Sequence, residues 1–472
     1  MRKPMLILPL SLVLGACSLT PEYVRPDVNA PGVWSQANHD TTQAETAQWW
    51  KQFGDPVLDQ LITTALAENK DMKIAVSRIE EARAQLGITE AQNLPQVSAQ
   101  LGSQKSMSSD QIYGKLPIPR KSETDQLVLG ASYEVDLWGK LRNASAAARE
   151  KLFASAYNRE ALRISLVSQV ATGYFHLRTL DRQLEISRIN LATQKETEKL
   201  TLKRFEGGIA SAYDYSQAKA QTALTETSLP ELERQIILQQ NALSILLGRS
   251  PGPIPRGRKI TELTQDITVP AGLPSQLLER RPDVLAAEAQ LRAANANIGS
   301  ARAAFLPRIS LTASGGYESH DLHALSDPGA AMWNLAAGLT QPIFAGGALK
   351  NQLRQAEASQ REMVATYQKT AQTAFREAED GFANLRLTRA QTDGKQARAA
   401  SLAAALRIAK LRYNEGLNSF MDLLDAERTQ LQAELDVATQ LNQQLSATVN
   451  LFAALGGGWD AEPARKEIDA AR

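Results

Sequence analysis

The sequence predicts a mainly α-helical chain with a membrane β-barrel portion, built from two internal repeats. Three observations support this fold class. A turn-like stretch occurs twice, as RFEGGIASAYDYSQ at 204–217 and as RYNEGLNSFMDLLD at 412–425. Each copy follows a long proline-free stretch rich in Ala, Gln, Arg and Glu, which favours helix. Two other regions alternate apolar and polar residues, as membrane-type β-strands do.

The N-terminus is typical of a signal peptide over residues 1–16, with a basic start, an apolar stretch and small residues before Cys17. The residues ending at Cys17 resemble the lipobox of bacterial lipoproteins. This predicts a lipid, such as palmitate, on Cys17 and a lipid-anchored segment over 17–51. Ser18 points to sorting to the outer membrane. Cys17 is the only cysteine, so no disulfide is expected. The alternative is an ordinary secretory peptide with a chance cysteine.

Matching residues at a near-constant spacing divide the rest of the chain into a first repeat over 52–250 and a second over 264–458. A linker over 251–263 joins them, and a tail follows at 459–472. A solenoid would need shorter and more numerous periods. The matched positions include Asp71 and Asp283, Gly87 and Gly299, Gly139 and Gly347, Gly173 and Gly381, and Gly248 and Gly456.

Each repeat begins with a predicted helix, over about 55–93 and about 275–306. A Leu-Pro pair ends both helices, because proline cannot continue a helix and restrains the residue before it. The period of the apolar residues then changes from helical to alternating, which places a β-hairpin after each helix.

The hairpins are predicted within about 96–137 and 308–344, with loops near 103–124 and 315–331. The polar face of the first hairpin carries Glu134, which suits a water-filled lumen. Four strands cannot close a barrel and an open sheet edge cannot sit in lipid, so several chains would have to pool their strands. The alternative is a small water-soluble sheet packed on helices.

A long helix is predicted after each hairpin, over about 140–206 and 348–414, and each would run for about 100 Å. A return helix follows the repeated turn, over about 212–247 and 420–455, with apolar residues three and four apart. Helices of this length cannot be buried in one compact domain. We therefore expect them to pack as coiled coils.

Composition and motifs argue against several classes of function. The chain has 52 basic and 51 acidic residues, so a nucleic-acid partner has no electrostatic support. It contains no P-loop, GxSxG or HExxH motif, and we predict no enzymatic activity, no metal site and no cofactor beyond the lipid on Cys17. His320 and His323 lie in a predicted hairpin loop and are interpreted as solvated.

Several motifs carry a resemblance to a known family. They are TPEYVRP at 20–26, YEVDLWGKLR at 133–142, LLERRPDVLAAE at 277–288 and AALGGGW at 453–459. Together with the lipobox, they resemble the outer-membrane factor family, the TolC-like exit ducts of Gram-negative tripartite export systems. The similarity covers essentially the whole mature chain. It is greatest to the lipidated, OprM-like branch that serves multidrug efflux pumps of the resistance-nodulation-division (RND) type.

The resemblance implies a homotrimer with a twelve-stranded β-barrel in the outer membrane, continued by a twelve-helix α-barrel in the periplasm. It implies contact with outer-membrane lipid and partnership with a periplasmic adaptor (membrane fusion) protein and an inner-membrane RND pump. The implied function is a passive, gated exit duct for drugs and other small molecules. A type I secretion channel, a metal-efflux channel and a non-pore periplasmic coiled-coil lipoprotein remain alternatives.

By the same resemblance, the repeated turns form the periplasmic tip and the second turn carries the gate. Asp422 and Asp425 match an aspartate pair that faces the lumen in the family. Two carboxylates about 8 Å apart in such a ring repel by roughly 2 kcal/mol at an effective dielectric near 20. Arg428 is a candidate partner for Asp425, and Met421 a candidate apolar layer of the constriction. The alternative is that Asp422 is a helix N-cap and Asp425 a first-turn acid.

Four further residues belong to the predicted tip. Gly208 and Gly416 occupy matching positions in the two turns. Family gates also use bonds between helices, and Tyr413 and Asp214 stand at the positions for one such bond. Asn418 stands where the best-known member of the family has an arginine, so a second bond lacks that donor.

Overall fold

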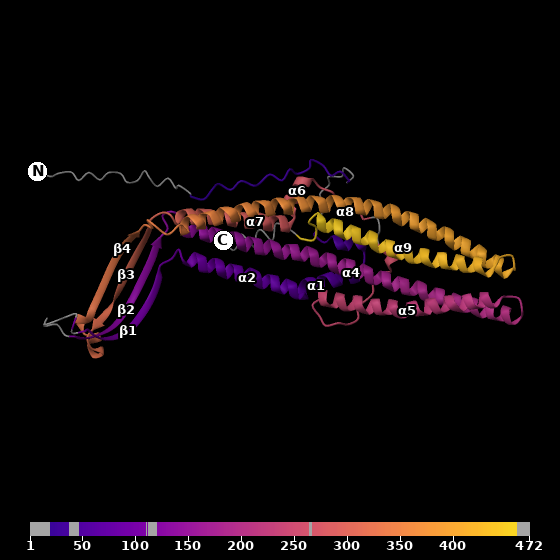
Figure 1. Ribbon diagram of the computed structural model, residues 1–472, viewed down its shortest axis with the longest axis horizontal. Helices are drawn as coiled ribbons and strands as arrows, with labels where there is room; N and C mark the ends of the chain where they lie inside the picture. Colours follow the sequence, from indigo (N-terminus) through magenta and orange to yellow (C-terminus); the bar gives the residue numbers. More distant parts are fainter. Residues whose placement is uncertain (1–18, 37–46, 110, 112–119, 264–266, 460–472) are drawn as a thin grey trace. The chain divides into compact units, whose positions relative to one another are not determined.

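The computed structural model describes residues 19–36, 47–109, 111, 120–263 and 267–459 (Figure 1). These residues form two compact units. Unit 1 lies within 1–26, 79–155 and 287–367, and unit 2 lies within 27–78, 156–286 and 368–472. Each unit therefore contains segments of both predicted repeats.

Unit 1 contains a four-stranded antiparallel sheet in the order β1-β2-β3-β4 (Figure 1). The strands are β1 (Gln96–Met107), β2 (Lys121–Val135), β3 (Arg308–Ser319) and β4 (Ala331–Thr340). The pairing of β2 with β3, in which Tyr133 lies opposite Leu311, joins the hairpin of the first repeat to that of the second. Within the described residues, β1 and β4 are the two edges of the sheet.

The bounds of the two predicted hairpin loops are wrong, because the strands run farther than the alternation indicates. β1 stays paired with β2 as far as Met107 opposite Lys121, inside the loop predicted at 103–124. β3 continues to Ser319, inside the loop predicted at 315–331. The outer parts of these strands are mostly polar on both faces. The period-two pattern therefore fades there, while backbone pairing continues regardless of the side chains.

The four longest helices are α4 (Lys140–Glu206), α5 (Ala212–Leu246), α8 (Ala348–Asn414) and α9 (Phe420–Ala454). The two long helices have the predicted bounds, and each return helix ends one residue earlier than predicted. The short 3-10 helices are η2 (Trp49–Phe53), η3 (Ile260–Glu262), η4 (Leu322–Ser326) and η5 (Pro328–Ala330). In the described part of the chain, no helix has both the length and the apolar character needed to cross a bilayer.

Each helix that precedes a hairpin is broken once, which corrects the single helices predicted over 55–93 and 275–306. The observed helices are α1 (Pro56–Glu68), α2 (Lys70–Ala91), α6 (Pro274–Arg280) and α7 (Pro282–Ala303). At the first break, Asn69 Oδ1 accepts the N–H of Met72 at 3.0 Å, and its Nδ2 donates to the carbonyl of Leu246 at 2.9 Å. Asn69 thus caps α2 and ties the break to the end of α5.

The second break follows the same plan with a different side chain. Arg281 Nη1 donates to the carbonyl of Ala454, the last residue of α9, at 3.1 Å. The glycine after α5 packs closely against the first break, where a Cβ on Gly248 would lie 2.1 Å from the carbonyl oxygen of Glu68. Both breaks are tied to carbonyls far away in the sequence. Pro282, at the start of α7, was a local signal for the second break that the prediction passed over.

The core of unit 2 is rich in aromatic side chains. Trp49 of η2 stacks on Phe452 of α9 with 5.1 Å between ring centroids. Phe53 meets Phe175 of α4 edge-on, with 4.9 Å between centroids. All four side chains are buried, so η2, α4 and α9 are held together by apolar burial and ring contacts.

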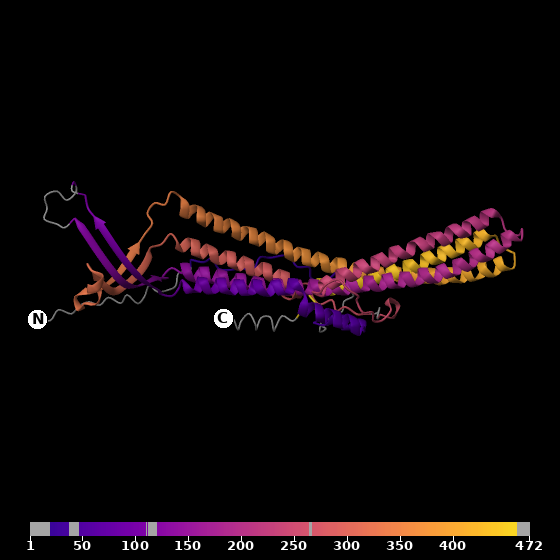
Figure 2. The same ribbon diagram turned by 90° about the horizontal axis from the view of Figure 1, so that it is seen from below.

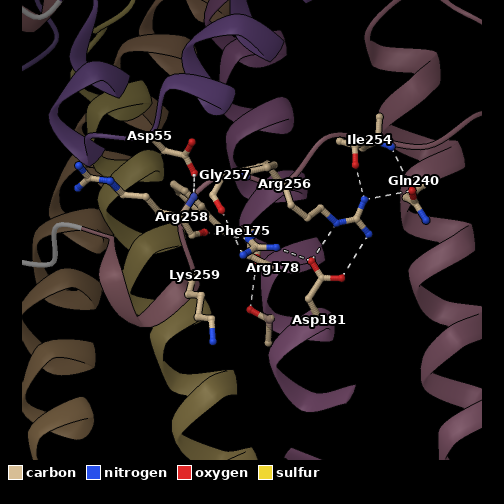
Figure 3. Close-up of polar contacts among 12 residues, drawn as sticks. Asp55, Phe175, Arg178, Asp181, Gln240, Ile254, Arg256, Gly257, Arg258 and Lys259 are labelled. Atoms are coloured by element: carbon tan, nitrogen blue, oxygen red, sulfur yellow. Dashed lines mark hydrogen bonds and ion pairs between the residues drawn. The ribbon is translucent and has the colours of Figure 1, made fainter. Parts of the chain in front are cut away.

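A buried carboxylate fastens the linker to this core (Figure 3). Asp55, the N-cap of α1, accepts hydrogen bonds from the Tyr174 hydroxyl at 2.8 Å and from the N–H of Arg258 at 3.1 Å. The N–H of Gly257 donates to the same hydroxyl at 2.9 Å. Burial raises the pKa of Tyr174, and the hydrogen bond to Asp55 adds to this rise. The predicted linker over 251–263 is therefore anchored to α1 and α4.

In unit 1 the TPEYVRP motif at 20–26 is held against α7. Arg25 forms an ion pair with the buried Glu288, and the Tyr23 hydroxyl donates to the same carboxylate at 3.1 Å. Arg292, one turn further along α7, also pairs with Glu288, at 2.8 Å. Burial, and then the charge of Glu288, raises the pKa of Tyr23 to about 12.

Some predicted features lie outside the described residues. They are the signal peptide over 1–16, the lipidation site Cys17 and residues 460–472 of the tail. His320, which is described, has its Nδ1 2.9 Å from the backbone oxygen of Glu123 and is exposed. Among the described residues, no three His, Cys, Asp or Glu side chains are grouped in a way that could hold a metal ion.

Candidate functional site at the two turns of unit 2

The repeated turns have the same backbone structure and lie side by side at one end of unit 2 (Figures 1 and 2). In the first, Gly208 has φ 75° and the next N–H, of Ile209, donates to the carbonyl of Arg204 at 2.7 Å. In the second, Gly416 has φ 72°, and the N–H of Leu417 donates to the carbonyl of Arg412 at 2.8 Å. Both are Schellman motifs, whose left-handed position favours glycine. Gly208 and Gly416 thus end α4 and α8.

Each return helix starts with a capping box. The Ser211 hydroxyl accepts the N–H of Asp214 at 3.1 Å, and the Asp214 carboxylate accepts the N–H of Ser211 at 3.2 Å. Ser419 and Asp422 make the same pair of bonds, at 3.2 and 3.0 Å. The N-cap of α9 is therefore Ser419 and not Asp422, which is the first-turn acid of the capping box, and Asp425 lies beyond the first turn. This arrangement leaves the Asp422 carboxylate exposed.

A buried apolar cluster positions the second turn. Its members are Ala218, Tyr413, Phe420, Leu423 and Leu424. Leu423 and Leu424 point into the cluster, so Met421, Asp422 and Asp425 are left on the exposed side of α9. The three residues predicted to line the constriction thus share the exposed side of one helix.

The arrangement of Arg428 differs from the predicted one. Its Nε donates to Gln221 Oε1 of α5 at 2.6 Å, and it does not pair with Asp425. The Asp425 carboxylate makes no hydrogen bond or ion pair with any described residue. Arg428 therefore ties α9 to α5, and no described residue forms an ion pair with Asp425.

The predicted bond between Tyr413 and Asp214 is not formed in the protomer. The Asp214 carboxylate is engaged by Ser211, as described above. Tyr413 instead packs beneath Arg204, whose guanidinium carbon lies 4.5 Å from the ring centroid. The same guanidinium donates to the carbonyls of Tyr413 and Asn414, both at 3.4 Å. Arg204 therefore joins the two turns.

Sequence reasoning missed a buried acid beside the predicted gate. Glu427 of α9 is 3% exposed and accepts a hydrogen bond from the Thr197 hydroxyl of α4 at 3.3 Å. Burial raises the pKa of Glu427, although the Thr197 bond and the charge of Lys410 act in the opposite direction. The signal was present, because Glu427 follows the buried Leu423 and Leu424 by four and three residues and so lies on the same helix face.

With this geometry established, comparison with known proteins defines the class. The model of the outer membrane efflux protein family matches residues 61–249 and 273–457, so the chain belongs to that family. It is 38% identical to outer membrane protein OprJ of Pseudomonas aeruginosa, covering 98% of this chain and 97% of OprJ. It is 36% identical to the probable efflux pump outer membrane protein TtgC of Pseudomonas putida, covering 95% and 94%.

A solved structure supports the same assignment. The CmeC outer membrane channel of Campylobacter jejuni superposes with a TM-score of 0.88 at 29% identity, over 96% of this chain and 98% of that chain. The predicted family, its TolC-like mainly helical fold and the outer-membrane location are thereby confirmed. The family is one of efflux channels and not an enzyme family.

Proposed function

We propose that this protein is the outer-membrane exit duct of a tripartite RND-type efflux pump. It conducts drugs and other small molecules passively from periplasm to exterior, through a gated channel formed by three copies of the chain. Family membership supports the efflux role. The closely related TtgC is itself named as an efflux pump component.

The open four-stranded sheet carries the proposal. Its edge strand β4 exposes an alternating row of apolar side chains, in which Leu335 is 74% exposed. An open edge and a free apolar face are unstable in water, and an open edge is equally unstable in lipid. Three copies would bring twelve strands together and remove every edge.

The proposed partners follow from exposed apolar residues in each of the two units. The lipid on Cys17 and the apolar face of the sheet would contact the outer membrane. Ile209 and Leu417, which follow the turn glycines at matching positions, are exposed apolar residues suited to a periplasmic adaptor. The adaptor would connect the duct to an inner-membrane RND pump, which selects the cargo.

The proposed gate consists of Asp422 and Asp425 from three chains, with Met421 as an apolar layer. Support comes from the shared exposed side of α9 and from the lack of a compensating partner for Asp425. Six carboxylates in a narrow ring repel one another and attract cations. Cations held between these carboxylates obstruct the narrow pore at rest, and the pore clears when the adaptor moves the helices outward.

The test is single-channel conductance of the purified protein in a planar bilayer. An Asp422→Asn/Asp425→Asn variant keeps an oxygen that can cap α9 but removes both charges. We expect a small native conductance, a severalfold larger one in the variant, and weaker cation preference. Asp214→Asn, which makes the same change in the capping box of the first turn, is the matched control and should behave like the native protein.

The outcomes separate the parts of the proposal. A pore with equal conductance in all three proteins would keep the duct and remove the gate from Asp422 and Asp425. No conductance from folded trimers would favour a non-pore coiled-coil lipoprotein. Equal increases in the variant and the Asp214→Asn control would show that helix capping, and not ring charge, controls the opening.

A further inference from the structure

The contact between the two turns is asymmetric, because one turn donates both hydrogen bonds and the other accepts them. Arg204 of the first turn supplies the donors, and the carbonyls of Tyr413 and Asn414 in the second turn accept. The two turns share one backbone structure, so a symmetric contact would also have Arg412 donating to Phe205 and Glu206. No such return contact is formed among the described residues, and Arg412 Nε donates to Asn418 of its own turn at 2.8 Å.

The groups that would form the return contact, Arg412 and the first turn around Phe205, are exposed. Phe205 is 40% exposed, whereas Tyr413 at the matching position is 5% exposed beneath Arg204. Arg412 is exposed, and its Nη1 and Nη2 atoms make no hydrogen bond to a described residue. These are the two atoms that Arg204 uses for its pair of carbonyls. Each protomer therefore has one free donor turn and one free acceptor turn.

The return helices show the same asymmetry. Ile237 of α5 is 56% exposed, whereas Leu445, at the matching position of α9, is 1% exposed and lies in the core of unit 2. Other exposed apolar side chains of α5 include Leu224, Leu238 and Ile245. The first hairpin thus lacks a neighbour on the side where the second hairpin has one. A second copy of the chain, which carries the matching α8–α9 hairpin, fits this vacant side.

We propose that Arg412 reaches the first turn of the adjacent copy. Its Nη1 and Nη2 donate to the carbonyls of Phe205 and Glu206 of the partner subunit, and its guanidinium lies over the ring of the partner's Phe205. A head-to-tail contact that repeats by rotation closes into a ring. The inference rests on the trimer of the proposed function. The tip then holds six equivalent contacts, three within chains and three between chains.

Cross-linking with a short bis-maleimide tests this placement. Arg412→Cys/Glu206→Cys should give covalent dimers and trimers on a denaturing gel. Arg204→Cys/Asn414→Cys, the matched control for the contact seen within one chain, should react without an increase in mass. The single-cysteine variants should give no ladder. Native mass by light scattering is measured on the same samples.

The readouts distinguish the possible failures. If light scattering shows trimers in which the control cysteines cross-link but the test cysteines do not, the inference is overturned and the trimer stands. Particles of one chain would overturn the trimer and the inference together.

A second measurement applies if a cysteine pair disturbs folding. Arg412→Ala should lower the midpoint temperature of trimer dissociation by several degrees, and Asn418→Ala should leave it nearly native. Equal decreases would mean that Arg412 acts only within its own turn, which would contradict the intersubunit contact.

Discussion

Asp425 shows how one residue separates two otherwise equal turns. Both turns have the glycine, the Schellman bonds and the capping box, so capping chemistry does not distinguish Asp422 from Asp214. The position that matches Asp425 in the first turn is Gln217. Asp425 therefore adds an acid that the first turn lacks at this position, and its carboxylate makes no hydrogen bond or ion pair with a described residue.

Glu427 predicts a pH dependence of stability. Because burial raises its pKa, the folded chain binds this proton more tightly than the unfolded chain does. The stabilisation is complete below the unfolded pKa and is lost as pH rises through the folded pKa. Glu427→Gln keeps a neutral side chain at all pH values. Thermal unfolding should show it about 1 kcal/mol more stable than the native protein near pH 8, and nearly equal near pH 4.

A substitution at an exposed acid distinguishes the effect of burial on stability from the effect of removing one negative charge. Glu415→Gln removes one acid from the nearby turn, where the side chain is exposed. It should give the same small change at both pH values. A stability gain for Glu427→Gln that is equally large near pH 4 would mean that packing, and not ionisation, is responsible.

At the scale of elements, helix ends are decided by distant partners. Asn69 and Arg281 stand at the same place in their repeats and break their helices by bonding to the end of the following return helix. Asn69 donates from its amide and Arg281 from its guanidinium, so both repeats tie the helix break to the return helix although the residue differs. Proline at position 282 also favours the second break, since it restrains the residue before it.

Gly257 in the linker has no room for a larger side chain, so its substitution should destabilise the fold. A Cβ on Gly257 would lie 2.0 Å from Asp55 Oδ1, so Gly257→Ala must displace a buried carboxylate from its hydrogen bonds. We expect a loss of about 2–4 kcal/mol in the free energy of unfolding, measured by denaturant titration. Gly252→Ala is the control from the same linker, because the nearest atom to its Cβ is 3.9 Å away. Equal losses in the two variants would contradict a specific clash at Asp55.

At the scale of the whole molecule, the two faces of β4 test the proposed barrel. Leu335 lies on the exposed apolar face and Asn334 on the opposite face. If the trimer closes a barrel, Leu335→Arg places a charge in lipid and costs about 2–4 kcal/mol near the bilayer midplane. Asn334→Arg places the same charge in the water-filled lumen and should cost much less. Urea unfolding in lipid vesicles measures both, and equal costs would argue against the barrel.

The sequence by itself determined the features that depend on local pattern. The two long helices follow from proline-free, helix-forming stretches that glycines bound, and the return helices follow from Ser-x-x-Asp signals, although α5 contains Pro230. The ends of all four helices were predicted within one residue. The inner parts of the strands follow from alternation. The family follows from motifs spread along the whole chain. Each of these signals acts between residues that are close in sequence, so they survive without knowledge of tertiary contacts.

Only the tertiary structure decided where distant segments meet. It placed the helix break at Asn69, the bond from Thr197 to Glu427, the bond from Arg428 to Gln221 and the one-way contact of Arg204 with the second turn. These features share a physical cause. Each depends on a carbonyl, an amide or a hydroxyl supplied by a segment far away in the chain, and such partners leave no periodic trace around the residue that uses them.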